Sequence, residues 1–570
     1  MFNCLTRAHY LLSRQLWLVI NPPKPVRWFW LVIALIIGIS YGIAALPDFS
    51  LQYLIPDDGR QHLFWTARFL DPKLFPGDRI ADYFQSVAPW GFQSIYRLGA
   101  VFNLAPWDIA KWIPIPLSLA TAWGAFLVSE TWLPLPAANA LTSILLLQNL
   151  WLRDDLASGT ARAFLNPLFF VVLLGIQRRS PQLLIPAILI LGGFYPHYVL
   201  ITGVILGLEI LRQQIWDKKR FNLWSLELGG AIACILVLLP FAINASEFGP
   251  TISRAIAQTL PEFLPDGRSR FFYDDFGRFW LSGGRSGIQI PLNPPLYCFG
   301  LLLPILYRWK HKFPLLQQVG SNVNLLNRLT LASFITFFAA HLLLFRLHLP
   351  SRYTQHSLRI VLASAAVIAL FALLDVLWNR LNATVGKIIA IALIAFALLY
   401  PLTYKNFPRT NYVTGDRPDL YAYLQTQPKT IRIASLSGIA NNLPTFAQRT
   451  VLTGAEYAIP YHWGYYEQFR QTTLDLITAQ YTPDPTVLAQ AIATHGITHW
   501  LIDRSAFTPD YFENQKWLRQ YQPAFAIARK SPASSYLATQ LEGCKTFETP
   551  ELYVVDANCL VKTPQETSQE

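Results

Sequence analysis

The sequence predicts a mostly α-helical, polytopic membrane protein with about eleven membrane-spanning helices, followed by a C-terminal α/β domain outside the membrane. The first observation is composition. Of 570 residues, 53% are hydrophobic and only 14% are charged, whereas a soluble domain carries about 25% charged residues. The second observation is a series of apolar runs that ends near residue 404. The third is the polar remainder of the chain, in which helix-like and strand-like segments alternate.

The first apolar run covers residues 28–46, close to the roughly 20 residues that a spanning helix needs. It is longer than the apolar core of a signal peptide, so we interpret it as an uncleaved anchor. The segment 89–107 is apolar but contains Arg97 and prolines, and we interpret it as an interfacial helix. The remaining predicted spans lie at about residues 112–128, 132–150, 163–177, 181–196, 197–211, 226–244, 291–308, 327–347, 358–377 and 386–404.

Basic residues set the predicted topology. With the N-terminus in the cytoplasm, the short inner loops contain Arg178, Arg179, Arg212 and Lys218, as the positive-inside rule requires. The net charge of +12 is therefore interpreted as a sign of topology and not as a surface for nucleic acid. An odd number of spans then places the C-terminal domain outside. We expect a multi-pass protein of a bacterial plasma membrane.

This topology divides the chain into a transmembrane region, 1–404, and an extracytoplasmic α/β domain, 405–570. In the second region, "TIRIASL" and "ITHWLIDR" are rich in β-branched and aromatic residues and are predicted to be strands. The outer loops of the first region are predicted at about residues 47–111, 151–162, 245–290 and 346–357.

Two cysteines near the end of the chain, Cys544 and Cys559, are candidates for a disulfide. An outer domain lies in an oxidising compartment if the membrane belongs to a bacterial envelope. The bond then closes a loop of about 15 residues and stabilises the fold by about 3 kcal/mol. The alternative is a pair of free thiols.

Pairs of adjacent aspartates gather on the predicted outer face of the membrane. They are Asp57–Asp58, Asp154–Asp155 and Asp274–Asp275. A random scatter of such pairs would divide between the two faces. Their common location therefore indicates a function at the outer surface.

The first pair lies in "LIPDDGRQHLFW", shortly after the first span. One interpretation is a helix cap, because acids favour helix N-termini, although a cap needs only one acid. Asp58 and His62 are four residues apart and would share a helix face. This spacing suits a proton-transfer pair or two ligands of a divalent cation such as Mg²⁺ or Mn²⁺. We take Asp57 and Asp58 as the candidate catalytic residues.

Basic residues in other outer segments suit an anion. Arg162 follows the second acidic pair in "DDLASGTAR", His197 lies at an inferred outer turn, and Arg352 lies in "LPSRY". The positive-inside rule disfavours arginine in outer loops, and a bound phosphate would explain it because arginine makes bidentate phosphate contacts. The alternative is contact with lipid headgroups. The loop at 245–290 contains glycines and aromatic residues, and such a loop can close over a substrate.

Together these features resemble the polyprenyl-phosphate-dependent membrane glycosyltransferases of the GT-C superfamily. The shared features are an acidic motif after the first span, interfacial helices behind it, a second acidic motif in the next outer loop, a long outer loop and a C-terminal outer domain. "LPSRY" is similar to the arginine-bearing outer end of a late span in some of these enzymes. The sequence lacks the WWDYG-type signature of oligosaccharyltransferase subunits, so transfer of whole oligosaccharides to asparagine is not expected.

The resemblance implies a role for each motif. Asp57 or Asp58 would be the base or would orient the acceptor. Asp154 or Asp155 would be the second acidic group. The residues implied at the donor phosphate are Arg352, Arg162, His197 and Tyr353.

The implied reaction moves a sugar from a polyprenyl-phosphate donor to an acceptor in the cell envelope: a glycan, a glycolipid or a protein. Direct displacement needs a base for the acceptor hydroxyl and positive charge on the departing phosphate, from arginine or a metal. It inverts the anomeric centre. Two other classes stay open. A transporter or flippase would carry ionisable residues near the middle of its spans and often internal repeats. A non-catalytic scaffold would only present its outer domain.

Overall fold

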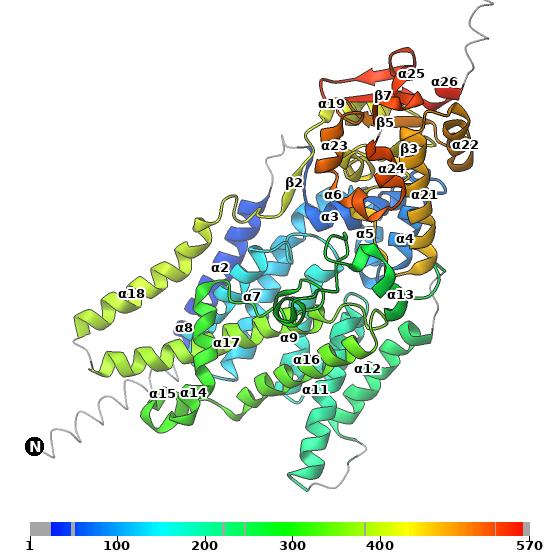
Figure 1. The fold of residues 1–570 in the computed structure, drawn as a ribbon. Helices are drawn as coiled ribbons and strands as arrows, with labels where there is room; N and C mark the ends of the chain where they lie inside the picture. Colours follow the sequence, from blue (N-terminus) through cyan, green and yellow to red (C-terminus); the bar gives the residue numbers. More distant parts are fainter. Residues whose placement is uncertain are drawn as a thin grey trace, which may run out of the picture.

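A computed structural model of the chain describes residues 24–46, 52–218, 222, 224–243, 247–380, 383–530 and 532–561. It is mostly helical, with long helices gathered in one part of the molecule and a sheet with shorter helices in another (Figure 1). The N-terminal segment predicted to lie in the cytoplasm is outside the described residues.

The apolar runs of the first region fold into a helical bundle. Its helices include α2 (Lys24–Ala45), α7 (Pro114–Glu130), α8 (Pro136–Trp151), α9 (Leu165–Gln177), α10 (Pro181–Gly192), α11 (Pro196–Ile215), α12 (Leu226–Ile243), α14 (Leu303–Arg308), α16 (Asn324–Leu342), α17 (Ser351–Arg380) and α18 (Ala383–Leu399). Helix α8 is buried along nearly its whole length and packs against α2, α7 and α17. Helix α17 also packs against α11 and α16. Helix α17 therefore lies between α8 on one side and α11 and α16 on the other.

Within the described residues, six stretches are long and apolar enough to cross a membrane: Lys24–Ala45, Pro106–Glu130, Pro196–Ile215, Leu226–Ile243, Ser321–Leu342 and Ser351–Leu377. The sequence predicts about eleven spans by length alone. Several of the predicted spans are short helices, such as α10 with 12 residues. A helix of that length extends about 18 Å, whereas the hydrocarbon core is about 30 Å thick. The count of about eleven therefore stays a prediction.

Four helices follow the first span on the way to α7. They are α3 (Asp57–Leu63), α4 (Arg79–Ser86), α5 (Trp90–Val101) and α6 (Pro106–Trp112). The segment 89–107, predicted as one interfacial helix, forms α5 and the first turn of α6. Pro106 separates the two because proline favours the first turn of a new helix.

The C-terminal region contains a five-stranded sheet in the order β4-β3-β5-β7-β6. Its strands are β3 (Arg432–Ser435), β4 (Thr450–Val451), β5 (His499–Asp503), β6 (Lys545–Glu548) and β7 (Leu552–Asp556). Strand β3 runs parallel to β4 and β5, with Ala434 opposite Trp500. Strand β7 is antiparallel to β5 and β6. Two long helices of this region, α21 (Trp463–Tyr481) and α22 (Pro485–His495), lie between β4 and β5 in the chain.

The C-terminal region shares one hydrophobic core with helices α3, α4, α5 and α6. Phe64 and Phe84 pack against Tyr457, and Tyr83 stacks on Tyr465 with ring centroids 3.8 Å apart. The short strand β1 (Leu54–Pro56), directly before α3, pairs antiparallel with β2 (Tyr412–Thr414). The acidic helix α3 is therefore held between the bundle and the C-terminal region, and the predicted boundary at residue 404 does not separate two independent cores.

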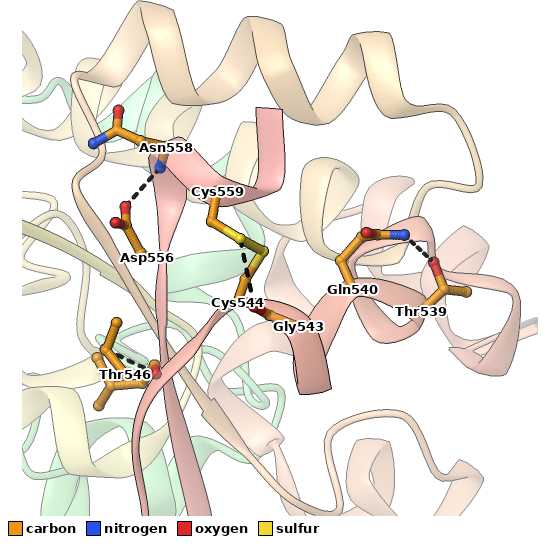
Figure 2. Close-up of a disulfide and its surroundings, with 9 residues drawn as sticks. Thr539, Gln540, Gly543, Cys544, Thr546, Asp556, Asn558 and Cys559 are labelled. Atoms are coloured by element: carbon orange, nitrogen blue, oxygen red, sulfur yellow. Dashed lines mark hydrogen bonds between the residues drawn. A yellow bond between two sulfur atoms is a disulfide. The ribbon is translucent and has the colours of Figure 1, made fainter. Parts of the chain in front are cut away.

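Cys544 and Cys559 form a disulfide with their Cα atoms 5.5 Å apart. The bond joins the end of α25 (Tyr536–Cys544) to α26 (Ala557–Val561), as Figure 2 shows. The two cysteines are separated by 15 residues and flank β6 and β7. The bond therefore closes a loop that contains the edge strand β6 and its neighbour β7.

Replacing Cys559 with serine is expected to lower the free energy of unfolding of the C-terminal region by about 3 kcal/mol, because the unfolded chain regains the freedom of the opened loop. Thermal denaturation under non-reducing conditions measures the effect. Cys298→Ser is the matched control, since Cys298 is a free, exposed cysteine. Equal melting temperatures for both variants would contradict the prediction.

Candidate active site

Helix α3 carries the first acidic pair and lies between the helical bundle and the C-terminal region. Strand β1 leads into it, and the backbone N–H of Asp57 donates to the carbonyl of Asn411 at 2.9 Å. Pro56 occupies the N-cap position, and neither aspartate caps the helix with its side chain. Instead, Asp154 accepts a hydrogen bond from the backbone N–H of Asp58 at 3.4 Å. The second acidic motif thus caps the helix that carries the first, and both side chains of the first pair stay available for other contacts.

Arg162 joins the two acidic motifs. Its guanidinium forms ion pairs with Asp58, with Asp154 at 3.0 Å and with Asp155 at 2.8 Å. Asp155 also pairs at 2.6 Å with Arg359 of α17, whose side chain is fully buried. This network links α3, the loop after α8 and the N-terminal part of α17. It brings together residues that the sequence predicted separately as catalytic, acidic and anion-binding.

Two glycines allow these segments to approach. A Cβ atom on Gly59 of α3 would lie 2.9 Å from the carbonyl oxygen of Ser158, too close for any other residue without a shift of the backbone. Gly159 has φ +64°, a conformation that favours glycine. The hydroxyl of Tyr96 donates to the Gly159 carbonyl at 2.7 Å and fixes the loop in place. The ion-pair network therefore rests on close backbone packing.

The charges in the network keep two of the acids ionised. Burial acts to raise the pKa of Asp58, but the positive charges of Arg162 and Arg352 oppose it, and that pKa lies below its ordinary value. Burial opposes ionisation of Asp155 as well, yet neighbouring arginines hold its pKa well below the ordinary value. An ionised carboxylate locked to arginine is a poor proton acceptor. We therefore assign Asp58 and Asp155 to the framework of the site.

The other two acids have raised pKa values. Burial raises the pKa of Asp154 to about 6, against the charge of Arg162. Burial also raises the pKa of Asp57 above its ordinary value, with Arg60 acting in the opposite direction and Glu456 acting in the same direction. The side chain of Asp57 is 44% exposed, and only its Oδ1 atom is held by Arg60. Asp57 is therefore the most exposed of the four acids.

His62 does not form the predicted pair with Asp58. Its ring lies edge-on against Phe84, with centroids 5.2 Å apart. The hydrogen bonds of the described residues include none between His62 and Asp58. Burial lowers the pKa of His62, so the ring is neutral at pH 7. The four-residue spacing places His62 and Asp58 on the same face of α3 and does not indicate a hydrogen bond between them.

Apart from Arg162, the predicted anion-binding residues lie near the N-terminal end of α17. Arg352 donates to Gln355 at 3.3 Å, and within the described part of the chain it has no ion pair with a carboxylate. His197, at the start of α11, lies 5.2 Å from the ring of His348 and 6.0 Å from that of Tyr353. The Tyr353 hydroxyl donates to a backbone carbonyl at 2.9 Å, so that hydroxyl is already occupied. Among the predicted anion-binding residues, Arg352 is therefore an arginine without a carboxylate partner in the described part of the chain.

His356 belongs to the same basic segment as Arg352, "RLHLPSRYTQHSLRI". Its side chain is 1% exposed, and neither ring nitrogen has a hydrogen-bond partner. It lies one helical turn beyond Arg352, with its ring 5.9 Å from that of Tyr195. Buried polar groups are normally paired. An unpaired imidazole beside an open arginine marks a place for a polar ligand. The four-residue spacing in "RYTQH" is a signal that the sequence contains.

The third acidic pair does not join the site. Asp274 and Asp275 lie on an exposed turn, where Asp275 accepts a hydrogen bond from the backbone N–H of Arg278 at 2.5 Å. A local turn explains these residues. The predicted common function of three acidic pairs is therefore wrong for this pair.

A divalent cation was expected among the acids. Within the described residues, no group of three or more His, Cys, Asp or Glu side chains is arranged to hold a metal ion. The carboxylates of Asp58, Asp154 and Asp155 converge on the guanidinium of Arg162 instead. This arrangement fits an arginine and does not fit Mg²⁺ or Mn²⁺ ligated by the same oxygens.

Comparison with known proteins gives a structural match. No protein-family model matches the chain, and neither does any curated protein. The oligosaccharyltransferase of Archaeoglobus fulgidus, solved with a tethered acceptor peptide that contains the NVT sequon, superposes with a TM-score of 0.54 and 12% identity, over 90% of this chain and 72% of that chain. The chain has the GT-C fold. The fold that the sequence resemblance predicted is therefore confirmed.

Two other GT-C structures are also similar to this chain, with lower scores. Arabinofuranosyltransferase AftD from mycobacteria gives a TM-score of 0.46 at 15% identity, over 83% of this chain and 36% of that chain. ArnT from Cupriavidus metallidurans, bound to undecaprenyl phosphate, gives 0.37 at 15% identity, over 94% and 99%.

Proposed function

We propose that this protein is a membrane glycosyltransferase that moves a sugar from a polyprenyl-phosphate donor to a hydroxyl acceptor on the outer side of the membrane. One observation carries the proposal. The carboxylate of Asp57 is half exposed and has a raised pKa, and it lies on the same helix as Asp58. The positive charge of Arg352 is close enough to Asp58 to lower the pKa of that acid. Direct displacement of a phosphate by a hydroxyl needs a base near a positively charged group.

The chemistry follows from these positions. Asp57 takes the proton of the acceptor hydroxyl as the acceptor oxygen bonds to the anomeric carbon. The bond from that carbon to the phosphate oxygen breaks, and the phosphate leaves with the electron pair. Arg352, His356 and His197 bind the phosphate and stabilise its charge. Attack opposite the leaving group inverts the anomeric centre.

The shared fold supports the same class of reaction, because the archaeal protein of this fold is an oligosaccharyltransferase. This chain lacks the WWDYG-type signature, so the proposed acceptor is a hydroxyl of an envelope glycan, glycolipid or protein. The membrane lipids around the bundle would hold the polyprenyl chain of the donor.

A deletion strain tests the proposal when it is complemented with the wild-type protein, Arg352→Ala or Arg346→Ala. Polyprenyl-phosphate sugars and envelope glycans are quantified by mass spectrometry at equal expression. We expect Arg352→Ala to lack a glycan and to accumulate a lipid-linked sugar. Arg346 is exposed, and its variant should restore the wild-type pattern. Identical glycans and lipid-linked sugars in the deletion strain and the wild type would contradict a transferase. Accumulation of the donor on the inner leaflet only would favour a flippase.

Chelation of divalent cations is expected to leave the transfer rate of the purified protein unchanged, because Arg162 supplies the positive charge among the acids. The assay compares rates after EDTA treatment with rates after addition of Mg²⁺ or Mn²⁺. A rate that EDTA abolishes and Mn²⁺ restores would overturn the assignment of Arg162 to this role.

A further inference from the structure

Arg60 connects the proposed base to the C-terminal region. Its side chain is buried, and it donates to Asp57 Oδ1 at 2.6 Å and to Asn442 Oδ1 at 2.6 Å. The same guanidinium lies 3.6 Å from the carboxylate of Glu456. One arginine is therefore shared between the proposed base and an acid that lies far away in the chain.

Glu456 lies on η10 (Ala455–Tyr457) and is held from several sides. Its carboxylate pairs at 2.7 Å with Arg268, which comes from the long outer loop. Its backbone N–H donates to the Asn441 side chain at 3.0 Å, and its carbonyl accepts a hydrogen bond from Gln61 of α3. Its position is therefore fixed relative to α3, to the C-terminal region and to the loop.

The loop is fixed at the same place by further bonds from Arg268. The guanidinium donates to the carbonyl of Ala455 at 3.2 Å, and the backbone N–H donates to the side chain of Gln520 at 3.0 Å. Arg268 thus contacts the C-terminal region in three ways, and one of these contacts is the carboxylate that faces Arg60. The outer loop and α3 meet at this single acid.

Resting on the proposed function, we propose that Glu456 is a positioning residue of the active site, which acts on Asp57 through Arg60 and is itself oriented by Arg268 of the outer loop. Without the negative charge of Glu456, the guanidinium of Arg60 would pair with Asp57 alone and would bind the Asp57 carboxylate more tightly. Because Glu456 shares the guanidinium, Asp57 keeps one oxygen free and stays basic. The C-terminal region is therefore part of the catalytic unit.

The sign of the effect follows from the charges around Asp57. Arg60 and Asp58 act on it from its own helix, and Glu456 acts on it from the C-terminal region. Arg268 faces Glu456 from the loop, and Asn442 is a neutral partner of Arg60. A negative neighbour raises the pKa of a carboxylate, so the loss of Glu456 should lower the pKa of Asp57.

The test is the pH dependence of kcat/KM for Glu456→Gln, Glu456→Asp and Glu548→Gln. We expect the acid limb of Glu456→Gln to move to lower pH by about one unit, a shift of the size that neighbouring charges commonly produce in folded proteins. Glu456→Asp keeps the charge and should restore most of the wild-type profile. Glu548 is a half-exposed acid of the same region and serves as the control.

Two outcomes would overturn the proposal. One is an unmoved acid limb in a folded, active Glu456→Gln protein. The other is a zero coupling energy between Arg268→Gln and Glu456→Gln in a double-mutant cycle of thermal unfolding, which tests the loop contact without any activity. A non-zero coupling energy, together with a wild-type protein that transfers no sugar, would contradict the proposed function and leave the contact intact. The two failures are therefore distinguishable.

Discussion

Replacing Asp57 with asparagine is expected to lower the rate of sugar transfer by about 10²–10⁴-fold, the usual contribution of a general base. The amide has the size of the carboxylate but accepts no proton at neutral pH. The rate is measured with purified protein, a polyprenyl-phosphate sugar and an acceptor identified from the deletion strain. Wild-type activity itself should fall as the pH drops through the raised pKa of Asp57, at a higher pH than for an ordinary aspartate.

The control for this experiment is Asp274→Asn, which also replaces an aspartate with asparagine but lies on an exposed turn. It should leave the rate near that of the wild type. If Asp58→Asn abolishes transfer while Asp57→Asn retains the wild-type rate, Asp58 is the base and the assignment based on Arg162 is wrong. Binding of the donor, measured separately, should be unchanged in Asp57→Asn because the proposed phosphate contacts lie on α11 and α17.

Replacing Asp155 with asparagine is expected to destabilise the protein by about 3–5 kcal/mol, because it leaves a buried arginine without its counter-charge. Asp155 pairs with Arg162 at 2.8 Å and with Arg359 at 2.6 Å, and the Arg359 side chain is fully buried. Thermal unfolding in detergent measures the change. The pKa of Asp155 is lowered by folding, so its contribution is complete above the ordinary carboxyl pKa and is lost as the pH falls through the lowered value.

Asp82→Asn is the matched control for this loss of stability. Asp82 pairs with Arg68 at 2.7 Å, but its side chain is 44% exposed. Exposed ion pairs contribute about 0–1 kcal/mol. If Asp155→Asn and Asp82→Asn melt at the same temperature, the buried network does not stabilise the bundle. A large loss in Asp155→Asn alone would also explain any loss of activity as unfolding.

Much of the fold could be predicted from local patterns. Apolar runs of the right length gave helices α2, α11, α12, α16 and α17 near their expected positions, because a helix in a bilayer must satisfy its own backbone. The segments "TIRIASL" and "ITHWLIDR" became strands β3 and β5. Shorter apolar runs were less informative. Length and hydropathy do not state whether a helix of 12 residues spans the membrane or is covered by its neighbours.

The candidate site was only partly predictable. Asp57, Asp58, Asp154 and Arg162 stand out as charges in loops next to apolar spans, and the structure places them together. The sequence did not distinguish their roles. Whether an aspartate is a free base or the partner of an arginine depends on contacts that adjacent letters do not contain.

The sequence by itself determined that the chain is a membrane protein with its acidic motifs near the ends of apolar spans, because hydropathy and charge are properties of local segments. Only the tertiary structure decided which aspartate is exposed, which side chains Arg60 contacts and that Glu456 lies near Asp57. Arg60 and its partner Asn442 are separated by 382 residues. Such contacts arise when α3 packs into the core that it shares with the C-terminal region, and they depend on distances in space that a single sequence does not record.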